Sequence, residues 1–411
     1  MSEWKKYKLG EIAEIKGGKR LPKGELLVDY ETPHPYIRVT DMGKKWVRKS
    51  GLQFVTPKVQ KTISRYVVNS GDVILSIVGS IGLVGRISQE LDGANLTENC
   101  VKLLTNKTIV NDDFLFYFLI SDEGQYEIEK RNVGSTQPKL PLYNIKDIDI
   151  LLPSLSEQTA IASILSSLDD KIDLLHRQNA TLEKMAETLF RQWFIEEAKE
   201  EWEEETFEKW ILETVGGDWG KGSIEDEFTK AVYCLRGTDI ADLNNGLPNK
   251  TPIRFIKEKK FQSISPNEGD LIIEVSGGTE NQSTGRICYI NNQVKALFDY
   301  PLVFSNFCRM IRIKKPEYSF FVYCYIQYLY NQDEFFNLEN GSSGIKNLDY
   351  KTLLFDLKYK MPDENFVIKF HNQVKSLFQK VNQNKTQIRT LSALRDLLLP
   401  KLMSGEITVK F

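Results

Sequence analysis

Cations on short loops are the residues of this sequence best suited to a chemical role. Lys19 and Arg20 directly follow Gly17-Gly18, so a flexible turn presents two positive charges. Positive side chains on such loops are suited to phosphate oxygens, a contact that carries no sequence information by itself. A single cation is more often a solvated surface charge, but a set on one stretch favours phosphate contact. A second group surrounds Trp46 and includes Lys44, Lys45 and Arg48.

Arginine, threonine and aspartate recur together on two predicted strand edges. Arg38 lies beside Thr40-Asp41, and the same arrangement returns 198 residues later at Arg236. These side chains carry the donors and acceptors that hydrogen-bond to base edges in the grooves of DNA. We therefore expect both copies to contact bases. The candidates in the second half of the chain are Lys221, Arg236, Thr238 and Asp239.

The charges of the chain are unevenly distributed, although the formal net charge of its 411 residues is only −2. Residues 1–65 hold 15 Lys and Arg against 7 Asp and Glu, whereas residues 151–205 hold 5 against 13. A phosphate backbone is attracted by the first stretch and repelled by the second. We expect nucleic acid at the first stretch. In the second, we expect the helix to contact protein and residues 196–205 to be a solvated linker between the two halves of the chain.

Signatures of familiar catalytic sites are missing from the sequence. It has no G-x-x-x-x-G-K-[ST], H-E-x-x-H or G-x-S-x-G motif, and no Asn-Pro-Pro-aromatic motif of amino-methyltransferases. The five cysteines and three histidines are scattered, without a C-x-x-C pair. No apolar run approaches the length of about 18 residues that predicts a membrane span. The sequence therefore predicts a binding protein of the reducing cytoplasm, without catalysis, metal or cofactor of its own.

Two long stretches have apolar residues separated alternately by four and three positions, which is the seam of a coiled coil. The first seam begins at Ile161 and the second at Phe370, and a shift of 209 residues superimposes them. One helix cannot bury such a seam alone, so we expect the two helices to pair. The positions expected to set the helix register are Leu168, Ile172, Leu175, Asn179, Leu182, Val381, Asn384, Ile388 and Leu391.

Each seam contains one asparagine, Asn179 in the first and Asn384 in the second. A polar residue at a seam position usually pairs with another and excludes other alignments. A parallel pair of helices would set each asparagine against an apolar residue of the other seam. We therefore expect an antiparallel coiled coil in which Asn179 and Asn384 share one layer.

The globular parts of the chain repeat as well, since Gly71-Asp72 returns as Gly269-Asp270 at the same offset of 198 residues. Short strand-like runs bounded by Gly, Asp and Ser predict an α+β fold with two similar domains on curved or barrel-like sheets. We place the first domain at residues 1–152, the first coiled-coil helix and an acidic linker at 153–205, the second domain at 206–361 and the second helix at 362–411.

Several phrases of the sequence together resemble the specificity subunits of type I restriction–modification systems, over essentially the whole chain. The phrases are GSTQPKLPLYNIKDIDILLPSLSEQTAIASIL at residues 134–165, LFRQWF at 189–194 and LLLPKLMSGEI at 397–407. The turn at the start of the first phrase recurs as GSSGIK at residues 341–346, where Gly344-Ile345 replaces Gln137-Pro138. These two turns add Gln137, Lys139 and Lys346 to the candidate DNA contacts.

The resemblance implies a scaffold that reads double-stranded DNA through two target-recognition domains, each specific for one half of a bipartite sequence. It also implies two adenine-methylating partner subunits and two ATP-driven restriction subunits. S-adenosylmethionine, ATP and Mg²⁺ would belong to those partners.

The sequence leaves two alternatives to the function of a specificity subunit, an enzyme and a structural adaptor. A fused or stand-alone methyltransferase or nuclease would need the catalytic motifs that the sequence lacks. A structural coiled-coil adaptor would need no DNA contact, and a gel shift at two salt concentrations separates it from a DNA-reading protein.

Overall fold

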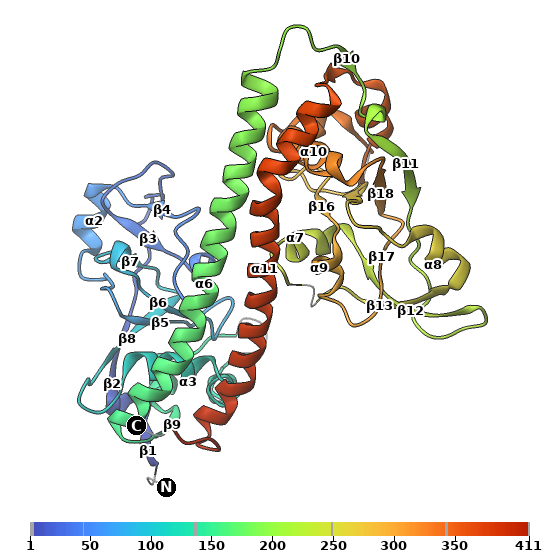
Figure 1. Cartoon of the computed structure of the whole chain (residues 1–411). Helices are drawn as coiled ribbons and strands as arrows, with labels where there is room; N and C mark the ends of the chain where they lie inside the picture. Colours follow the sequence, from blue (N-terminus) through green and yellow to red (C-terminus); the bar gives the residue numbers. More distant parts are fainter. Residues whose placement is uncertain (1–3, 44, 135–137, 248–249, 342–343, 410–411) are drawn as a thin grey trace. The chain divides into compact units, whose positions relative to one another are not determined.

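The computed structural model describes residues 4–43, 45–134, 138–247, 250–341 and 344–409 (Figure 1). Internal contacts divide the chain into two units, residues 1–171 with 391–411 and residues 172–390. Each unit contains one globular module together with part of α6 (Leu155–Arg191) and part of α11 (Glu364–Met403). We call the part of the first unit from β1 to β9 the first module, and the part of the second unit from β10 to β21 the second module.

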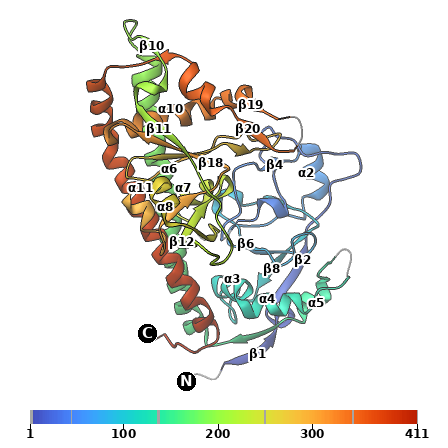
Figure 2. The ribbon, with the colours of Figure 1, turned by 90° about the vertical axis from the view of Figure 1, so that its right-hand side faces the viewer.

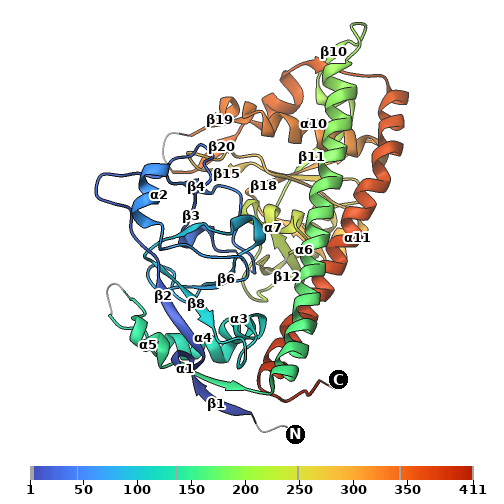
Figure 3. The same ribbon diagram turned by 90° about the vertical axis from the view of Figure 1, so that its left-hand side faces the viewer.

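The first module is built from short strands and helices. Its strands are β1 (Lys5–Lys8), β2 (Ala13–Gly17), β3 (Pro35–Ile37), β4 (Gln53–Phe54), β5 (Val73–Ser76), β6 (Val84–Arg86), β7 (Asn95–Leu96), β8 (Cys100–Thr105) and β9 (Asp149–Leu152). Its helices are α1 (Leu9–Ile12), α2 (Pro57–Ile63), α3 (Asp112–Ile120), α4 (Asp122–Glu129) and α5 (Leu142–Lys146). Val59 and Ile63 of α2 share a buried apolar cluster with Tyr36 of β3. Figure 3 shows α2 near β3 and β4.

The second module follows the same plan with additional short strands. Its strands are β10 (Glu204–Glu205), β11 (Ile211–Gly216), β12 (Phe228–Leu235), β13 (Ile253–Lys257), β14 (Leu271–Glu274), β15 (Ser276–Gly277), β16 (Ile287–Tyr289), β17 (Leu302–Phe304), β18 (Cys308–Ile313), β19 (Glu339–Asn340), β20 (Lys346–Leu348) and β21 (Tyr359–Lys360). Its helices are α7 (Ile240–Asn244), α8 (Glu258–Ile264), α9 (Asn292–Lys295) and α10 (Ser319–Asn331). The small sheet β15–β20–β19 lies near the end of α10 (Figure 2).

The two modules have the same sheet topology. A four-stranded sheet has the order β2–β8–β5–β6 in the first module and β11–β18–β14–β16 in the second. A three-stranded sheet has the order β4–β3–β7 in the first and β13–β12–β17 in the second, and in both the last pair is parallel. The repeat seen in the sequence is therefore a repeat of the fold.

Each module is closed by its own first and last strands. In the first, β1 pairs antiparallel with β9, and Lys5 lies opposite Leu152. In the second, β10 pairs antiparallel with β21, and Glu204 lies opposite Lys360. The chain therefore enters and leaves each module at one place.

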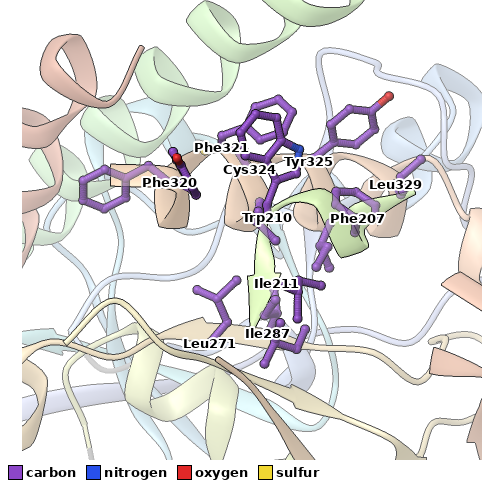
Figure 4. Close-up of a cluster of buried hydrophobic side chains, with 14 of the residues drawn as sticks. Phe207, Trp210, Ile211, Leu271, Ile287, Phe320, Phe321, Cys324, Tyr325 and Leu329 are labelled. Carbon is purple, nitrogen blue, oxygen red and sulfur yellow. The ribbon is translucent and has the colours of Figure 1, made fainter. Parts of the chain in front are cut away.

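A buried aromatic and aliphatic cluster joins the sheet of the second module to α10 (Figure 4). Trp210 is 2% exposed, and its ring centroid lies 5.6 Å from that of Phe321 and 4.9 Å from that of Tyr318. Aromatic side chains bury the largest apolar areas, so this cluster supplies much of the stabilisation of the module.

The long helices meet inside each unit and run in opposite directions there. In the second unit, Asn384 Nδ2 donates to Asn179 Oδ1 at 2.9 Å, and the Trp193 and Phe370 ring centroids lie 6.0 Å apart. In the first unit, Arg395 Nη1 lies 3.0 Å from Asp169 Oδ1. The asparagine pair lies in the layer that the seams predict. Of the other predicted register positions, Ile172, Leu175, Val381 and Ile388 are buried, while Leu168, Leu182 and Leu391 are partly buried.

Two expectations from the sequence need correction. In the described residues the sheets are open and have two to four strands each, too few to close into a barrel. The acidic linker is not simply solvated either, because Trp202 is only 8% exposed and packs on Phe366 with ring centroids 5.4 Å apart. The last two linker residues form β10.

Candidate nucleic-acid interface

The segment from Arg38 to Asp41 forms a closed side-chain clamp. Arg38 Nε and Nη2 donate to the two carboxylate oxygens of Asp41 at 3.0 and 2.8 Å, and the Arg38 amide donates to the same carboxylate at 2.8 Å. Arg38 Nη2 also donates to the Gly51 carbonyl at 3.0 Å, and Nη1 donates to Gln53. The hydrogen bonds to Asp41 raise the pKa of Arg38. All three guanidinium nitrogens are therefore already bonded within the first module.

The second module repeats this clamp with Arg236 and Asp239. Arg236 Nε and Nη2 donate to Asp239 at 2.9 and 2.7 Å, and the Arg236 amide donates at 3.0 Å. Asp239 is 3% exposed and Asp41 4% exposed, so both carboxylates are buried acceptors. A bidentate contact to guanine uses one edge of a guanidinium, and Asp41 and Asp239 already occupy the Nε–Nη2 edges of Arg38 and Arg236. The exposed hydroxyls nearby belong to Thr40 and Thr238.

The paired glycines before Lys19 bring two backbone segments into close approach. The Lys19 amide donates to the Leu96 carbonyl at 2.8 Å, and the Asp218 amide donates to the Phe304 carbonyl at 2.9 Å. A Cβ atom on Gly18 would lie 2.0 Å from the carbonyl oxygen of Thr97. One on Gly217 would lie 2.2 Å from that of Ser305. Glycine is therefore required at both positions, and Lys19-Arg20 correspond to Asp218-Trp219.

The loop side chains at this position differ between the modules. Arg20 is exposed and its Nε lies 2.7 Å from Glu98, which raises the pKa of Arg20. Lys19 Nζ lies 5.6 Å from the centre of the Tyr66 ring. In the second module Trp219 stacks against the Arg254 guanidinium, whose central carbon lies 4.5 Å from the ring centroid. A cationic loop in one module thus matches an aromatic loop in the other.

The cations around Trp46 do not form one free group. Lys45 is 8% exposed, and its Nζ lies 2.9 Å from Asp170 of α6, so it is a buried ion-pair partner. The sequence shows no sign of this pair, because the two residues are 125 positions apart. Arg48 is exposed, and Lys44 lies outside the described residues.

The remaining candidate cations lie on separate segments, Lys139 and Lys221 at isolated β-bridges and Lys346 in β20. Lys139 is exposed, and its backbone pairs with Val133. Lys221 Nζ lies 3.6 Å from Glu225, and Lys346 Nζ lies 2.8 Å from Glu339. Gln137 lies outside the described residues. Of the candidates in the second module, Arg236 and Thr238 line one pocket together with Trp219 of the glycine loop, whereas Lys221 and Lys346 are not in its lining.

A pocket of about 870 Å³ opens in the second module beside the clamp, with Arg236 and Thr238 in its lining. A buried ion pair lies beneath it, where Arg286 donates to Glu274 through Nε at 2.9 Å and Nη2 at 2.6 Å. Glu274 is 1% exposed and raises the pKa of Arg286. No motif in the sequence indicates this pair, nor Asn306 and Phe307 at the pocket rim.

In the parts of the chain that the structure describes, no cluster of three or more His, Cys, Asp or Glu could hold a metal ion. No helix among these residues is long and apolar enough to cross a membrane. All five cysteines are buried and unpaired.

The fold and these surfaces define a protein with two copies of one scaffold, which differ in their exposed loops. Residues 1–184 match the model of the type I restriction modification DNA specificity domain.

Relatives of known function match nearly the whole chain. It is 25% identical to the specificity subunit of the type I restriction enzyme MjaIX of Methanocaldococcus jannaschii, with 99% of this chain and 94% of the relative covered. It is 22% identical to the HindI specificity subunit of Haemophilus influenzae, with 99% and 100% covered. The crystal structure of the type I restriction–modification S subunit from M. genitalium matches with a TM-score of 0.59 and 18% identity, covering 100% of this chain and 97% of that one. That structure has the same fold.

Proposed function

We propose that this chain is the DNA specificity subunit of a type I restriction–modification complex. Each module reads one half of a bipartite target in double-stranded DNA. The observation that carries this proposal is the repeated scaffold, in which the strand order, glycine approach and Arg–Asp clamp recur while exposed loop residues differ. A shared framework with different exposed side chains suits two different half-sequences on the same kind of ligand.

The two long helices act as the spacer between the half-sites in this proposal. They pair as an antiparallel coiled coil, and the buried Asn179–Asn384 hydrogen bond fixes their register. Their outer faces dock the methylating subunits. Those subunits and the restriction subunits bring S-adenosylmethionine, ATP and Mg²⁺, and this chain contributes recognition without catalysis.

Mapping methylated adenines in the native genome tests this function. We expect a two-part motif with a fixed gap that disappears when the gene for this chain is deleted and returns with a plasmid copy. A methylation pattern that is unchanged by the deletion would contradict the proposal.

A gel shift of the purified chain with its methylating partner separates the DNA-reading protein from a structural adaptor. We expect binding of duplex DNA that weakens steeply between low and high salt, because cations displace counterions from the phosphates. An adaptor would give no shift at either salt concentration.

A further inference from the structure

A four-residue turn occupies the same place in both modules. It is Thr97 to Cys100 between β7 and β8, and Ser305 to Cys308 between β17 and β18. In each module the last residue donates its amide to the first carbonyl, at 3.1 Å in the first and 3.0 Å in the second. The turns are thus equivalent, and Glu98-Asn99 correspond to Asn306-Phe307.

The backbone of this turn is held by matching hydrogen bonds from neighbouring strands. The Thr97 amide donates to Ile37 at 3.0 Å, and the Ser305 amide donates to Leu235 at 2.9 Å. The carbonyl of the third residue accepts in both copies, and the backbone of the preceding strand end is bonded to the glycine loop. These main-chain bonds do not depend on the side chains of the two central residues. The turn can therefore carry different side chains on a fixed backbone.

The two central side chains of the second module are free to meet a ligand. Asn306 is exposed, and within the described residues its amide has no hydrogen-bond partner. Phe307 is 46% exposed, a large apolar surface for one side chain. Both lie at the rim of the 870 Å³ pocket beside the exposed Thr238. Rigid support beneath unpaired side chains is the arrangement that a recognition site requires.

We propose that Asn306 and Phe307 are the base-reading residues of the second module and recognise an A·T pair in the major groove. This assignment rests on the proposed DNA-reading function. An asparagine amide matches the adjacent donor and acceptor of adenine, N6 and N7, in a bidentate contact. A phenylalanine ring packs against the thymine methyl on the same edge of the pair. The Arg236 clamp and the buried Glu274–Arg286 pair hold the surrounding surface in place.

The matching turn of the first module differs in chemistry. Glu98 provides only acceptors, and Oε1 already binds Arg20 Nε at 2.7 Å. An acceptor at this position cannot reproduce the bidentate contact of asparagine with adenine. Substitution of Asn306 should therefore change the base selected at one A·T position of the second half-site. The sequence selected at the first half-site should stay the same.

Selection from a randomised duplex library tests the assignment. The full-length chain, assembled with its methylating partner, is compared with Asn306→Ala, Asn306→Asp and Phe307→Ala. We expect each variant to lose preference for adenine and thymine at one position of the second half-site, by between about fivefold and about 100-fold. The Asp variant keeps the side-chain shape but replaces the donor by a charged acceptor, so it tests the hydrogen bond at nearly unchanged packing.

Gln262→Ala is the matched control, because Gln262 is an exposed amide on α8 outside the pocket. It should leave the selected sequence unchanged, and all variants should keep the thermal unfolding midpoint of the parent. Unchanged preference in every Asn306 variant would overturn the assignment while the bipartite selection by the parent stands. A parent chain that selects no sequence would overturn the proposed function itself.

Discussion

The glycine loops of the two modules have the same backbone but opposite electrostatic character. Lys19-Arg20 in the first module occupy the positions of Asp218-Trp219 in the second, and the backbone amide of the first residue in each pair makes the same hydrogen bond. Backbone requirements are shared because both loops must pass close to a neighbouring strand. The side chains that follow the approach differ: Lys19 and Arg20 are exposed, whereas Asp218 and Trp219 are partly buried. The loop backbone and the side chains of the contact surface in each module are therefore under separate constraints.

Substitution of Gly18 or Gly217 by alanine removes the close backbone approach that the two loops share. It should have the largest effect on the unfolding free energy. The added Cβ would meet backbone oxygens at 2.0 and 2.2 Å, which cannot move aside as a side chain would. Each variant should lose about 3 kcal/mol of unfolding free energy, at the upper end for overpacking. Chemical denaturation measures the loss.

Gly17→Ala is the control for this pair, since a Cβ there meets nothing within 4 Å. It should change the unfolding free energy by less than about 1 kcal/mol, because glycine and alanine in a strand differ by roughly 0.5–1 kcal/mol in favour of alanine. If Gly217→Ala were as stable as Gly17→Ala, the close approach would not constrain the loop.

Removal of the clamp carboxylates should have the next largest effect on the unfolding free energy, and the size of the loss should differ between the two modules. Asp239→Ala leaves Arg236 with the Lys250 carbonyl at 2.9 Å, whereas Asp41→Ala leaves Arg38 with both Gly51 and Gln53. Loss of partners from buried polar groups costs about 1–3 kcal/mol. We expect Asp239→Ala to lower the unfolding free energy more than Asp41→Ala does.

Arg38→Ala decides between the clamp and the base contact expected from the sequence. A structural clamp predicts reduced unfolding free energy with the selected DNA sequence unchanged. Retained stability together with relaxed selection at one guanine would instead assign Arg38 to base reading.

Charge reversal in the first glycine loop should have a smaller effect, confined to binding. Lys19→Glu with Arg20→Glu should weaken binding to all sequences and reduce the salt dependence by about one unit of slope per lost phosphate contact. Fluorescence anisotropy over a salt series measures the slope. The double variant Lys107→Glu with Lys130→Glu changes charge equally on the same module and should alter the slope less. Equal slopes in both double variants would remove the electrostatic distinction between the loops.

The repeated architecture and the paired helices were accessible from the sequence because they are periodic. Apolar spacing of four and three residues gives the seams, and the Asn179–Asn384 hydrogen bond lies in the layer expected from them. Periodicity reports which faces are buried, so it predicts elements and their repeats well.

The loop chemistry was less accessible, because a sequence does not show which donors are already bonded. Arg38 looks free in the sequence but is held by Asp41, and Lys45 is held by Asp170, 125 residues away. The equivalence of Glu98 and Asn306 is hidden because the intervening loops differ in length. Arg38 and Arg236 are 198 residues apart, but these turn residues are 208 apart.

The pairing of β1 with β9 and of β10 with β21 has a consequence for how such a protein changes over generations. A module whose first and last strands are neighbours, about 4.8 Å apart, can be replaced by another of different length without moving its points of attachment. A single genetic exchange of the coding stretch between those strands would leave both helices unaltered. Inheritance could then supply a new recognition half in one event, instead of by gradual substitution of loop residues.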